Sequence, residues 1–286
     1  QRYRLAMDAS VDAIWEVDYA TDNLTFSTHW MNRFGIPHDN PFQRKTWLAL
    51  VHPDDRPLII AAFDSYTRSM SPHYDVEYRV RDLNNKYVWV RARGKALFDD
   101  NGNVLSVAGS LTDISEHKLQ EDKIYHLAYF DALTGLPNRR RLGLLLAEKS
   151  ILDQASGALL FIDLDNFKLI NDSSGHACGD ALIADVARQL AMAVGSSHIL
   201  ARIGGDEFIV VLTNTNRQAF IQAYAQRLIN LFNTPFSCQG HQYYLSASIG
   251  IAFFPKDGAG LDDLLRKADT ALHVAKATGR SAYRFF

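Results

Sequence analysis

The sequence predicts an α+β protein made of two domains that are joined by a helix. Its 286 residues exceed one ordinary domain, since domains commonly hold roughly 100–200 residues. The early part of the chain alternates apolar and polar residues with the period of two that antiparallel strands show, whereas the later part mixes short apolar strands with helical periodicity. We therefore expect domains at residues 1–114 and 130–286, connected by a helical linker at 115–129.

The first domain is predicted to be an antiparallel meander that follows short helices. From Tyr74 to Val80, Tyr and Val alternate with charged residues, so one face of a strand is buried. Residues 87–97 alternate in the same way, and residues 104–111 form the next strand. The segment Asp-Asn-Gly-Asn at 100–103 predicts the hairpin turn between them, because Asn and Gly tolerate positive φ.

The linker is predicted to be one short helix. Ser115 can cap its start, and Leu119, Ile124, Leu127 and Ala128 fall on one helical face. A helix of this length is marginal by itself, so its apolar face needs a partner. Two interpretations stay open: a stiff connector that pairs with its own copy in a dimer, or a helix that lies on one of the flanking domains.

The second domain alternates between strands and helices. Its expected elements are a buried strand at 158–164, a helix at 180–194, two strands within 199–212 about Gly204-Gly205, a helix at 217–232, a strand at 243–254 and a helix at 261–278 ended by Gly279. This mixture of helices and strands, without an internal repeat, predicts an α+β domain.

Composition excludes several classes of function. The net charge is -2, and both halves are balanced, with 13 Lys+Arg against 15 Asp+Glu up to residue 115 and 17 of each afterwards. Neither nucleic acid nor an anionic membrane is therefore an expected partner of these residues. Two cysteines, Cys178 and Cys238, and no apolar run long enough to span a bilayer favour a reducing, cytoplasmic setting. Because the chain begins at Gln1, we expect a fragment of a longer protein, and a membrane anchor elsewhere in that protein stays open.

Two acidic groups are predicted to meet at the ends of neighbouring strands. Asp163 and Asp165 close the apolar strand, and Asp206 and Glu207 follow the Gly204-Gly205 turn, where glycine lets a ligand approach the backbone. Carboxylates converging in this way suit Mg²⁺ that also holds a triphosphate, since Mg²⁺ takes few protein oxygens and completes its shell with phosphate and water. Taken alone, Gly-Gly-Asp-Glu is better explained as an ordinary hairpin turn.

Four motifs together resemble the GGDEF family of diguanylate cyclases. They are Asp-Ala-Leu-Thr-Gly-Leu-Pro-Asn-Arg at 131–139, Phe-Ile-Asp-Leu-Asp-Asn-Phe-Lys-Leu-Ile-Asn-Asp at 161–172 with Gly-His at 175–176 and Gly-Asp at 179–180, Arg-Ile-Gly-Gly-Asp-Glu-Phe at 202–208, and Ala-Lys-Ala-Thr-Gly-Arg at 275–280. The resemblance spans about 155 residues in the order of the family. It implies a palm or ferredoxin-like sheet surrounded by helices.

The resemblance implies a metal site and a catalytic pair. Asp163 and Asp206 would hold Mg²⁺ or Mn²⁺ together with the backbone carbonyl of Leu164. Asp206 is the expected base for the attacking 3′-hydroxyl, and Glu207 would assist the metal or fix a lysine such as Lys168.

The resemblance also implies the residues that bind GTP. Those expected to contact the nucleotide are Asn166, Phe167 and Lys168 at a helix start, Asn171, His176 and Asp180, the glycines Gly204 and Gly205, and the cations Lys276 and Arg280. Asn171 and Asp180 would hydrogen-bond guanine, and Lys276 and Arg280, four apart on one helical face, would grip phosphate. A favourable cation pair at a helix end is the alternative for the last two.

The implied reaction condenses two GTP into cyclic di-GMP and releases two pyrophosphates. Each domain binds one GTP, so activity requires a homodimer. One departure from the family concerns product inhibition, for which many members carry Arg-x-x-Asp before the glycines. Here those positions are Gly195, Ser196, Ser197 and His198, so we expect this inhibitory site to be absent.

The first domain resembles a PAS domain with its closing strands, over about residues 5–115. The segments that carry the resemblance are 15–18, 51–56, 87–91 and 109–115. It implies a five-stranded antiparallel sheet that cups a pocket, with Asp113 tying the last strand to a signalling helix. The ligand is unknown, and an empty, dimerising domain is an alternative. A haem ligand among His29, His38, His52 and His73 is disfavoured, and the four tryptophans are more often core than a ligand site.

Alternatives to a regulated cyclase stay open. The chain's last residues, Tyr-Arg-Phe-Phe, resemble the junction to an EAL phosphodiesterase domain, so this domain could be a GTP-binding regulator of such a partner. A cyclic di-GMP receptor is disfavoured by the missing Arg-x-x-Asp. Adenylyl cyclase or polymerase chemistry is disfavoured by Asn171 and Asp180.

Overall fold

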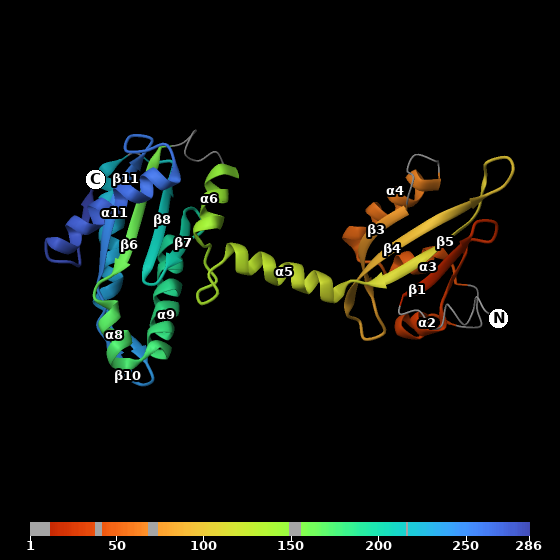
Figure 1. The fold of residues 1–286 in the computed structure, drawn as a ribbon, viewed down its shortest axis with the longest axis horizontal. Coiled ribbons are helices and arrows are strands. Elements are labelled where there is room, and N and C mark those ends of the chain that lie inside the picture. Colours follow the sequence, from red (N-terminus) through yellow and green to blue (C-terminus); the bar gives the residue numbers. More distant parts are fainter. Residues whose placement is uncertain (1–11, 38–41, 68–73, 149–155, 216) are drawn as a thin grey trace. The chain divides into compact units, whose positions relative to one another are not determined.

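A computed structural model describes residues 12–37, 42–67, 74–148, 156–215 and 217–286. The chain divides into two compact units, Gln1–Asp122 and Lys123–Phe286, and the boundary falls inside the linker helix (Figure 1). Each unit has its own hydrophobic core and is described by itself.

The N-terminal unit is a five-stranded antiparallel sheet with helices. The strands are β1 (Ala13–Asp18), β2 (Asn23–Phe26), β3 (Tyr74–Arg81), β4 (Tyr87–Phe98) and β5 (Val104–Asp113), and the helices are α2 (Thr28–Phe34), α3 (Arg44–Leu50), η1 (Pro53–Asp55) and α4 (Arg56–Thr67). The spatial order is β2-β1-β5-β4-β3. As predicted, Tyr74, Val76, Tyr78 and Val80 are buried, and they join side chains of the three α-helices in one core.

The linker is the helix α5 (Ser115–Tyr129), with the bounds that the sequence predicts. The hydroxyl of Ser115 accepts a hydrogen bond from the backbone N–H of Trp89 at 3.0 Å, which ties the start of the helix to β4. Asp113 accepts from the backbone N–H of Ser115 at 2.8 Å and pairs with Arg33, so this carboxylate ties β5 to the helix. The apolar side chains of Leu119, Ile124 and Leu127 are exposed.

The C-terminal unit contains a second five-stranded sheet. Its strands and helices are α6 (Arg139–Glu148), β6 (Gly157–Leu164), α8 (Phe167–Ser174), α9 (His176–Val194), β7 (Ile199–Gly204), β8 (Glu207–Thr213), α10 (Gln218–Asn230), η2 (Leu231–Asn233), β9 (Phe236–Cys238), β10 (His241–Tyr243), β11 (Ala247–Phe254), α11 (Leu261–Ala277) and β12 (Tyr283–Phe285). The order is β12-β11-β6-β8-β7, with β6 antiparallel to both neighbours and β12 parallel to β11.

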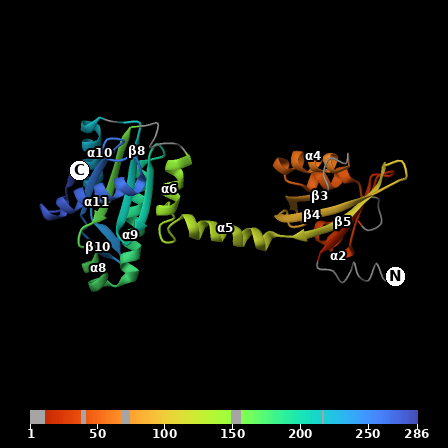
Figure 2. The ribbon, with the colours of Figure 1, turned by 45° about the horizontal axis from the view of Figure 1, so that its top comes forward.

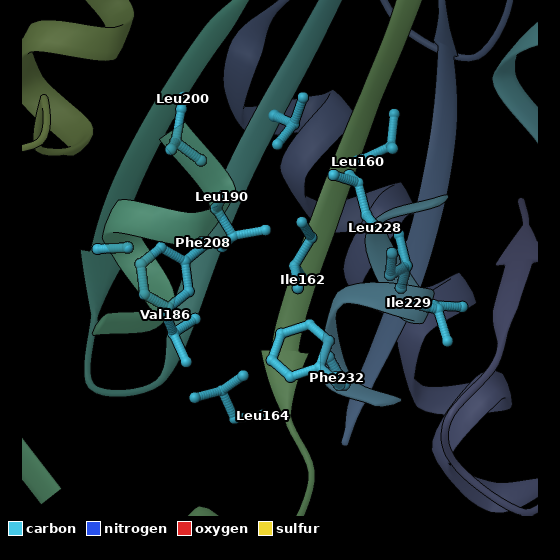
Figure 3. Packing of buried hydrophobic residues seen from close by; sticks show 14 of the residues in the cluster. Leu160, Ile162, Leu164, Val186, Leu190, Leu200, Phe208, Leu228, Ile229 and Phe232 are labelled. Carbon is cyan, nitrogen blue, oxygen red and sulfur yellow. The ribbon is translucent and has the colours of Figure 1, made fainter. Parts of the chain in front are cut away.

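Helices cover both faces of this sheet (Figure 2). Side chains of α9 and α10 pack on one face, and side chains of α6 and α11 pack on the other. Leu160, Ile162 and Leu164 of β6 meet Val186 of α9 and Leu228 of α10 in the first of these layers (Figure 3). All eight residues of β6 are buried, which explains why it appears in the sequence as one continuous apolar run.

Two expected elements differ from those observed. The helix expected from residue 180 begins at His176, because Gly175 adopts φ 80 and separates it from α8. The strand expected at 243–254 begins only at Ala247, as β11, and Tyr243 instead ends the separate strand β10, which forms a small hairpin with β9. Among the described residues, no helix combines the length and apolarity needed to cross a membrane.

Candidate active site

The acidic residues lie at one end of the β6–β8 pair. In the register of these strands Asp163 stands opposite Glu207, and the backbone N–H of Leu164 donates to the carbonyl of Asp206 at 3.3 Å. Gly205 and Asp206 form the turn between β7 and β8, and the two glycines are exposed while Asp206 and Glu207 are half-buried. The strand pairing therefore brings the predicted carboxylates together.

Asp163 is an acid whose environment resists its ionisation. It is 8% exposed, and burial raises its pKa, with the carboxylates of Asp206 and Asp165 adding to the effect. Lys276 of α11 opposes the shift through an ion pair of 2.6 Å between its Nζ and Oδ1 of Asp163. A lysine predicted to bind phosphate thus lies against a predicted metal ligand.

Glu207 shares this environment. Burial raises its pKa, and the carboxylates of Asp163, Asp206 and Asp269 raise it further, while Lys276 lowers it. The lysine whose charge acts on Glu207 is Lys276, from the helix that packs on β11 and β6. Lys168 is exposed in the first turn of α8.

The donor set fits a divalent cation that also binds phosphate. Within the described ranges, no group of three or more His, Cys, Asp or Glu residues could hold a metal ion by itself. The available oxygens are the carboxylates of Asp163 and Asp206 and the carbonyl of Leu164, which suits Mg²⁺ because it keeps several ligands from water and substrate phosphate. Burial is the main cause of the raised pKa values of Asp163 and Glu207, and the neighbouring carboxylates add to it, so additional positive charge would favour their ionised forms.

The start of α8 presents backbone N–H groups beside the end of β6. Asn166 adopts a left-handed conformation with φ 56, and the helix begins at Phe167, whose ring is buried and anchors the turn. Asn166 and Lys168 are exposed on either side of it. The first N–H groups of a helix have no intrahelical partner, so this turn can bind an anion.

The α8–α9 corner holds the residues expected to bind guanine. Asn171 lies on α8, while His176 and Asp180 are exposed in the first turns of α9. A Cβ atom on the buried Gly179 would lie 1.9 Å from Oδ1 of Asn171, so the side chain of Asn171 occupies the space that this glycine leaves. The corner thus places Asn171 next to the residue that precedes Asp180.

Lys276 and Arg280 do not lie on one helical face as the sequence predicts. The helix α11 ends at Ala277, and Gly279 and Arg280 continue with φ 122 and φ 63. The N–H of Arg280 donates to the carbonyl of Ala275 at 3.2 Å, which closes a turn after the helix. Lys276 therefore lies on the helix, and Arg280 lies on the exposed turn beyond it. Gly279 stops the helix short of Arg280.

Arg202 is a site residue that the sequence analysis left without a role. Its guanidinium donates to the carbonyl of Gly205 from Nε at 3.1 Å and from Nη2 at 2.6 Å, and Nη1 pairs with Asp131 at 2.6 Å. Its backbone N–H also donates to the carbonyl of Pro137. Arg202 thus fixes the glycine turn to the motif at 131–139 that opens the domain. Its place at the start of the 202–208 motif could have suggested a role at the site.

Asp165, which the sequence groups with the converging acids, binds other groups of the protein instead. Its carboxylate accepts from the hydroxyls of Ser246 at 2.8 Å and Ser248 at 2.7 Å, and from the backbone N–H of Ser281 at 3.1 Å. It is 7% exposed. Asp165 therefore ties the end of β6 to β11 and to the turn that carries Arg280.

The positions of the missing Arg-x-x-Asp lie between α9 and β7. Gly195 ends α9 with φ 69. His198 is half-buried against Tyr224, with ring centroids 5.6 Å apart, and its Nδ1 is buried without a hydrogen-bond partner among the described residues. Burial, assisted by Arg227, lowers the pKa of His198, which favours the neutral ring.

Two family descriptions match this chain. "Diguanylate cyclase, GGDEF domain" matches residues 128–282, and "PAS fold" matches residues 23–111. The solved structure of the GGDEF domain of the Pseudomonas aeruginosa protein TpbB, also named YfiN, has a TM-score of 0.51 and 35% identity, and it covers 55% of this chain and 94% of that one. The match agrees with the α+β architecture of the C-terminal unit.

Curated relatives extend beyond this chain. An uncharacterized Sinorhizobium fredii protein, y4lL, is 33% identical over 97% of this chain and 34% of its own length. The Pseudomonas aeruginosa protein MucR, named a bifunctional diguanylate cyclase/cyclic di-GMP phosphodiesterase, is 40% identical over 57% of this chain and 24% of its own length. The chain thus spans about a third or less of these relatives. The matches, the sheet and the acidic site together show that it belongs to the GGDEF family, with a PAS-fold domain ahead of the GGDEF domain.

Proposed function

We propose that the GGDEF domain is a diguanylate cyclase that condenses two GTP into cyclic di-GMP. The observation that carries this proposal is the meeting of Asp163, Asp206 and Glu207 at one end of the β6–β8 pair, beside the start of α8 and the ammonium of Lys276. Acids, phosphate-binding N–H groups and a cation in one place are the parts that nucleotidyl transfer requires.

Each side chain has a distinct role in this proposal. Asn171 and Asp180 hydrogen-bond guanine, and the N–H groups at Phe167 and Lys168 bind the β- and γ-phosphates together with Arg280. Asp163 and Asp206, with the backbone carbonyl of Leu164, would hold Mg²⁺, which would neutralise phosphate charge. Lys276, which pairs with Asp163, would contact phosphate.

The reaction is a pair of substitutions at phosphorus. The 3′-oxygen of one GTP forms a bond to the α-phosphorus of the other, the bond from that phosphorus to the bridging oxygen breaks, and pyrophosphate leaves with its electron pair. Asp206 accepts the proton of the 3′-hydroxyl. Since one domain supplies one GTP, two copies of the chain must face each other, and dimerisation is the natural point of control.

A regulatory role is the second candidate. MucR is named both a cyclase and a phosphodiesterase and is far longer than this chain, so a phosphodiesterase domain is expected in some relatives. In that case the GGDEF domain binds GTP and turns it over slowly. The complete acidic group favours the cyclase, since a regulator needs GTP binding but not the catalytic carboxylates.

The test is GTP turnover with Mg²⁺ by the 286-residue chain, with the product identified by mass. We expect cyclic di-GMP and pyrophosphate from the parent, and a loss of roughly 100-fold or more in Asp206→Asn, the scale of removing one transition-state contact. The matched control is Asp262→Asn, which removes an exposed carboxylate of α11 and should leave turnover unchanged. Tight GTP binding without product would favour the regulatory role, and equal turnover in both variants would contradict the assignment of Asp206.

A further inference from the structure

Cys178 and Cys238 come from distant parts of the chain and lie in one hydrophobic core. Cys178 is in the first turn of α9 and is 2% exposed, and Cys238 is the last residue of β9 and is 5% exposed. The helix and the strand pack against each other, and both side chains belong to the core on this face of the sheet. They are the only cysteines of the chain, so a disulfide formed within one chain must join them.

The two thiols interact in the folded protein, where both are free. A hydrogen bond with Cys178 raises the pKa of the Cys238 thiol, and burial and the charge of Cys178 add to the rise. Thiols that hydrogen-bond each other lie near contact distance. Side-chain rotation and a small backbone shift can therefore bring their sulfur atoms to the disulfide bond length of about 2.05 Å.

Tyr243 connects this pair of thiols to the end of α8. Its hydroxyl donates to Oγ of Ser174 at 3.1 Å, and that hydrogen bond lowers the pKa of Tyr243. Hydrogen bonding with Cys178, burial and the charges of the two thiols act in the opposite direction and raise the pKa overall. Tyr243 therefore contacts both the thiol pair and α8, the helix that carries Asn171.

The β9–β10 hairpin is the part of this cluster that can move. It is a two-stranded sheet in which Cys238 pairs with His241 and Phe236 pairs with Tyr243. Residues 239 and 240 form its exposed turn. A two-stranded hairpin is marginally stable by itself, whereas α9 has 19 residues, eight of them buried. Drawing the two sulfur atoms together should therefore displace the hairpin and leave α9 in place.

We propose that Cys178 and Cys238 form a reversible disulfide that weakens the binding of GTP. In the oxidised form Cys238 moves toward α9, Tyr243 moves with the hairpin, and its hydroxyl leaves Ser174. The end of α8 then loses a contact that holds it to the hairpin, and Asn171 lies one turn before that end. The effect on GTP rests on the proposed function, whereas the formation of the disulfide does not.

The oxidant is a hydroperoxide, which is small enough to reach the pair when the hairpin opens. The raised pKa of Cys238 keeps its proton in place, so the attacking thiolate is that of Cys178. Its sulfur bonds to one peroxide oxygen, the O–O bond breaks, and the other oxygen leaves and takes up a proton as water or an alcohol. The sulfur of Cys238 then displaces the oxygen of the sulfenic acid, which leaves as water with the thiol proton.

The intact mass of the 286-residue chain is a direct measurement of the bond. After treatment with hydrogen peroxide we expect a monomer that has lost the mass of two hydrogen atoms, with Cys178 and Cys238 cross-linked in its peptide map. Dithiothreitol should reverse both changes. The closed loop is about 60 residues long, so the C-terminal unit should melt roughly 5–10 °C higher when oxidised. Neither measurement needs a nucleotide, so a failure of the cyclase proposal leaves both in place.

The consequence is measured as the GTP affinity of the reduced and the oxidised protein. We expect the dissociation constant to rise about 3–10-fold on oxidation, the scale of one lost hydrogen bond, and to recover with dithiothreitol. In Tyr243→Phe the disulfide should still form, but oxidation should leave the affinity unchanged, because the contact with Ser174 is missing in both states. The matched control is the double variant Cys178→Ala/Cys238→Ala. It keeps all four methionines, so its affinity should not respond to peroxide.

Three outcomes would overturn the proposal. They are two free thiols after peroxide treatment, sulfinic acid or a bond between chains in place of the bond within one chain, and equal GTP affinity in the reduced and the oxidised parent. A parent that loses affinity on oxidation, beside a double alanine variant that does not, supports it.

Discussion

Asp165 shows how much of the candidate site depends on single buried polar residues. Asp163 and Asp206 are expected to touch ligand, whereas Asp165 touches three separate segments of the protein. Residues that hold ligating groups in place commonly change metal affinity or activity by about 10–100-fold when they are lost. Asp165 therefore belongs among the positioning residues of the site.

The variant Asp165→Asn should raise the KM for GTP and reduce turnover by roughly 10–100-fold. The amide puts a donor where Ser246, Ser248 and Ser281 supply donors, so the turn that carries Arg280 loses its anchor. Steady-state kinetics would measure both constants. Asp257→Asn is the matched control, since Asp257 is 9% exposed and accepts from the N–H of Phe253 away from the site. Equal KM values in the two variants would contradict the positioning role.

Asp55 is expected to make the stability of the N-terminal unit depend on pH in the acidic range. Hydrogen bonds from Arg79 hold its pKa below the ordinary value, against an opposing effect of burial. The unfolded value is about 3.9. A lowered folded pKa contributes stability that is fully present above about pH 4 and is lost as the pH falls through the folded value.

The variant Asp55→Asn should therefore destabilise the N-terminal unit at neutral pH by about 1–2 kcal/mol, the scale of hydrogen bonds to a charged group. Its stability should also fall less than that of the parent between about pH 5 and about pH 3. Urea unfolding followed by tryptophan fluorescence would measure both effects. Asp100→Asn, at an exposed hairpin turn, is the control. A parallel loss of stability with acid in parent and variant would count against the contribution of Asp55.

At the scale of elements, strands with a strong local pattern were predictable, whereas the short strands β9, β10 and β12 and contacts between distant segments were not. The eight consecutive buried residues of β6 and the alternating burial of β3 correspond to patterns in a short stretch of sequence. Both strands could therefore be predicted from the sequence. The break between α8 and α9 rests on one glycine conformation at Gly175, and the partners of Asp165 lie 81 to 116 residues away along the chain. Neither the break between the helices nor these contacts produces a hydrophobic periodicity in a short stretch of sequence, so neither could be predicted from the sequence alone.

The contact of α11 with β11 depends on Gly250. A Cβ atom there would lie 1.9 Å from the carbonyl of Ala268 and 2.4 Å from the backbone nitrogen of Leu272. Backbone atoms cannot move aside as a side chain can, so Gly250→Ala should destabilise the C-terminal unit by about 1–3 kcal/mol or more. Thermal unfolding followed by far-UV circular dichroism should show a lower midpoint for the C-terminal unit. The tryptophan signal comes only from the N-terminal unit and should keep its midpoint.

Gly143→Ala is the control for that substitution. Its Cβ atom would lie 3.7 Å from Leu261, an ordinary contact, and alanine favours the helix α6. We expect unchanged or slightly higher stability. A Gly250→Ala protein as stable as this control would show that α11 shifts on the sheet at little cost.

The whole molecule consists of two units with separate cores. The N-terminal unit encloses a cavity of about 290 Å³, and neither His29 nor His52 lines it, while His38 and His73 lie outside the described residues. The acidic group and the thiol pair lie inside the C-terminal unit. The sequence predicted the division into two units from its change of periodicity. It could not reveal the size of the cavity or the meeting of the thiols, because both depend on how distant segments pack.

The positions of the two cysteines have a consequence for following the C-terminal unit in solution. Cys178 on α9 and Cys238 on β9 are both reduced, buried and part of one hydrophobic core. A thiol reagent can reach them only when that core opens, so the labelling rate under native conditions measures the free energy of opening. GTP should slow labelling if it binds beside Cys178 at Gly179.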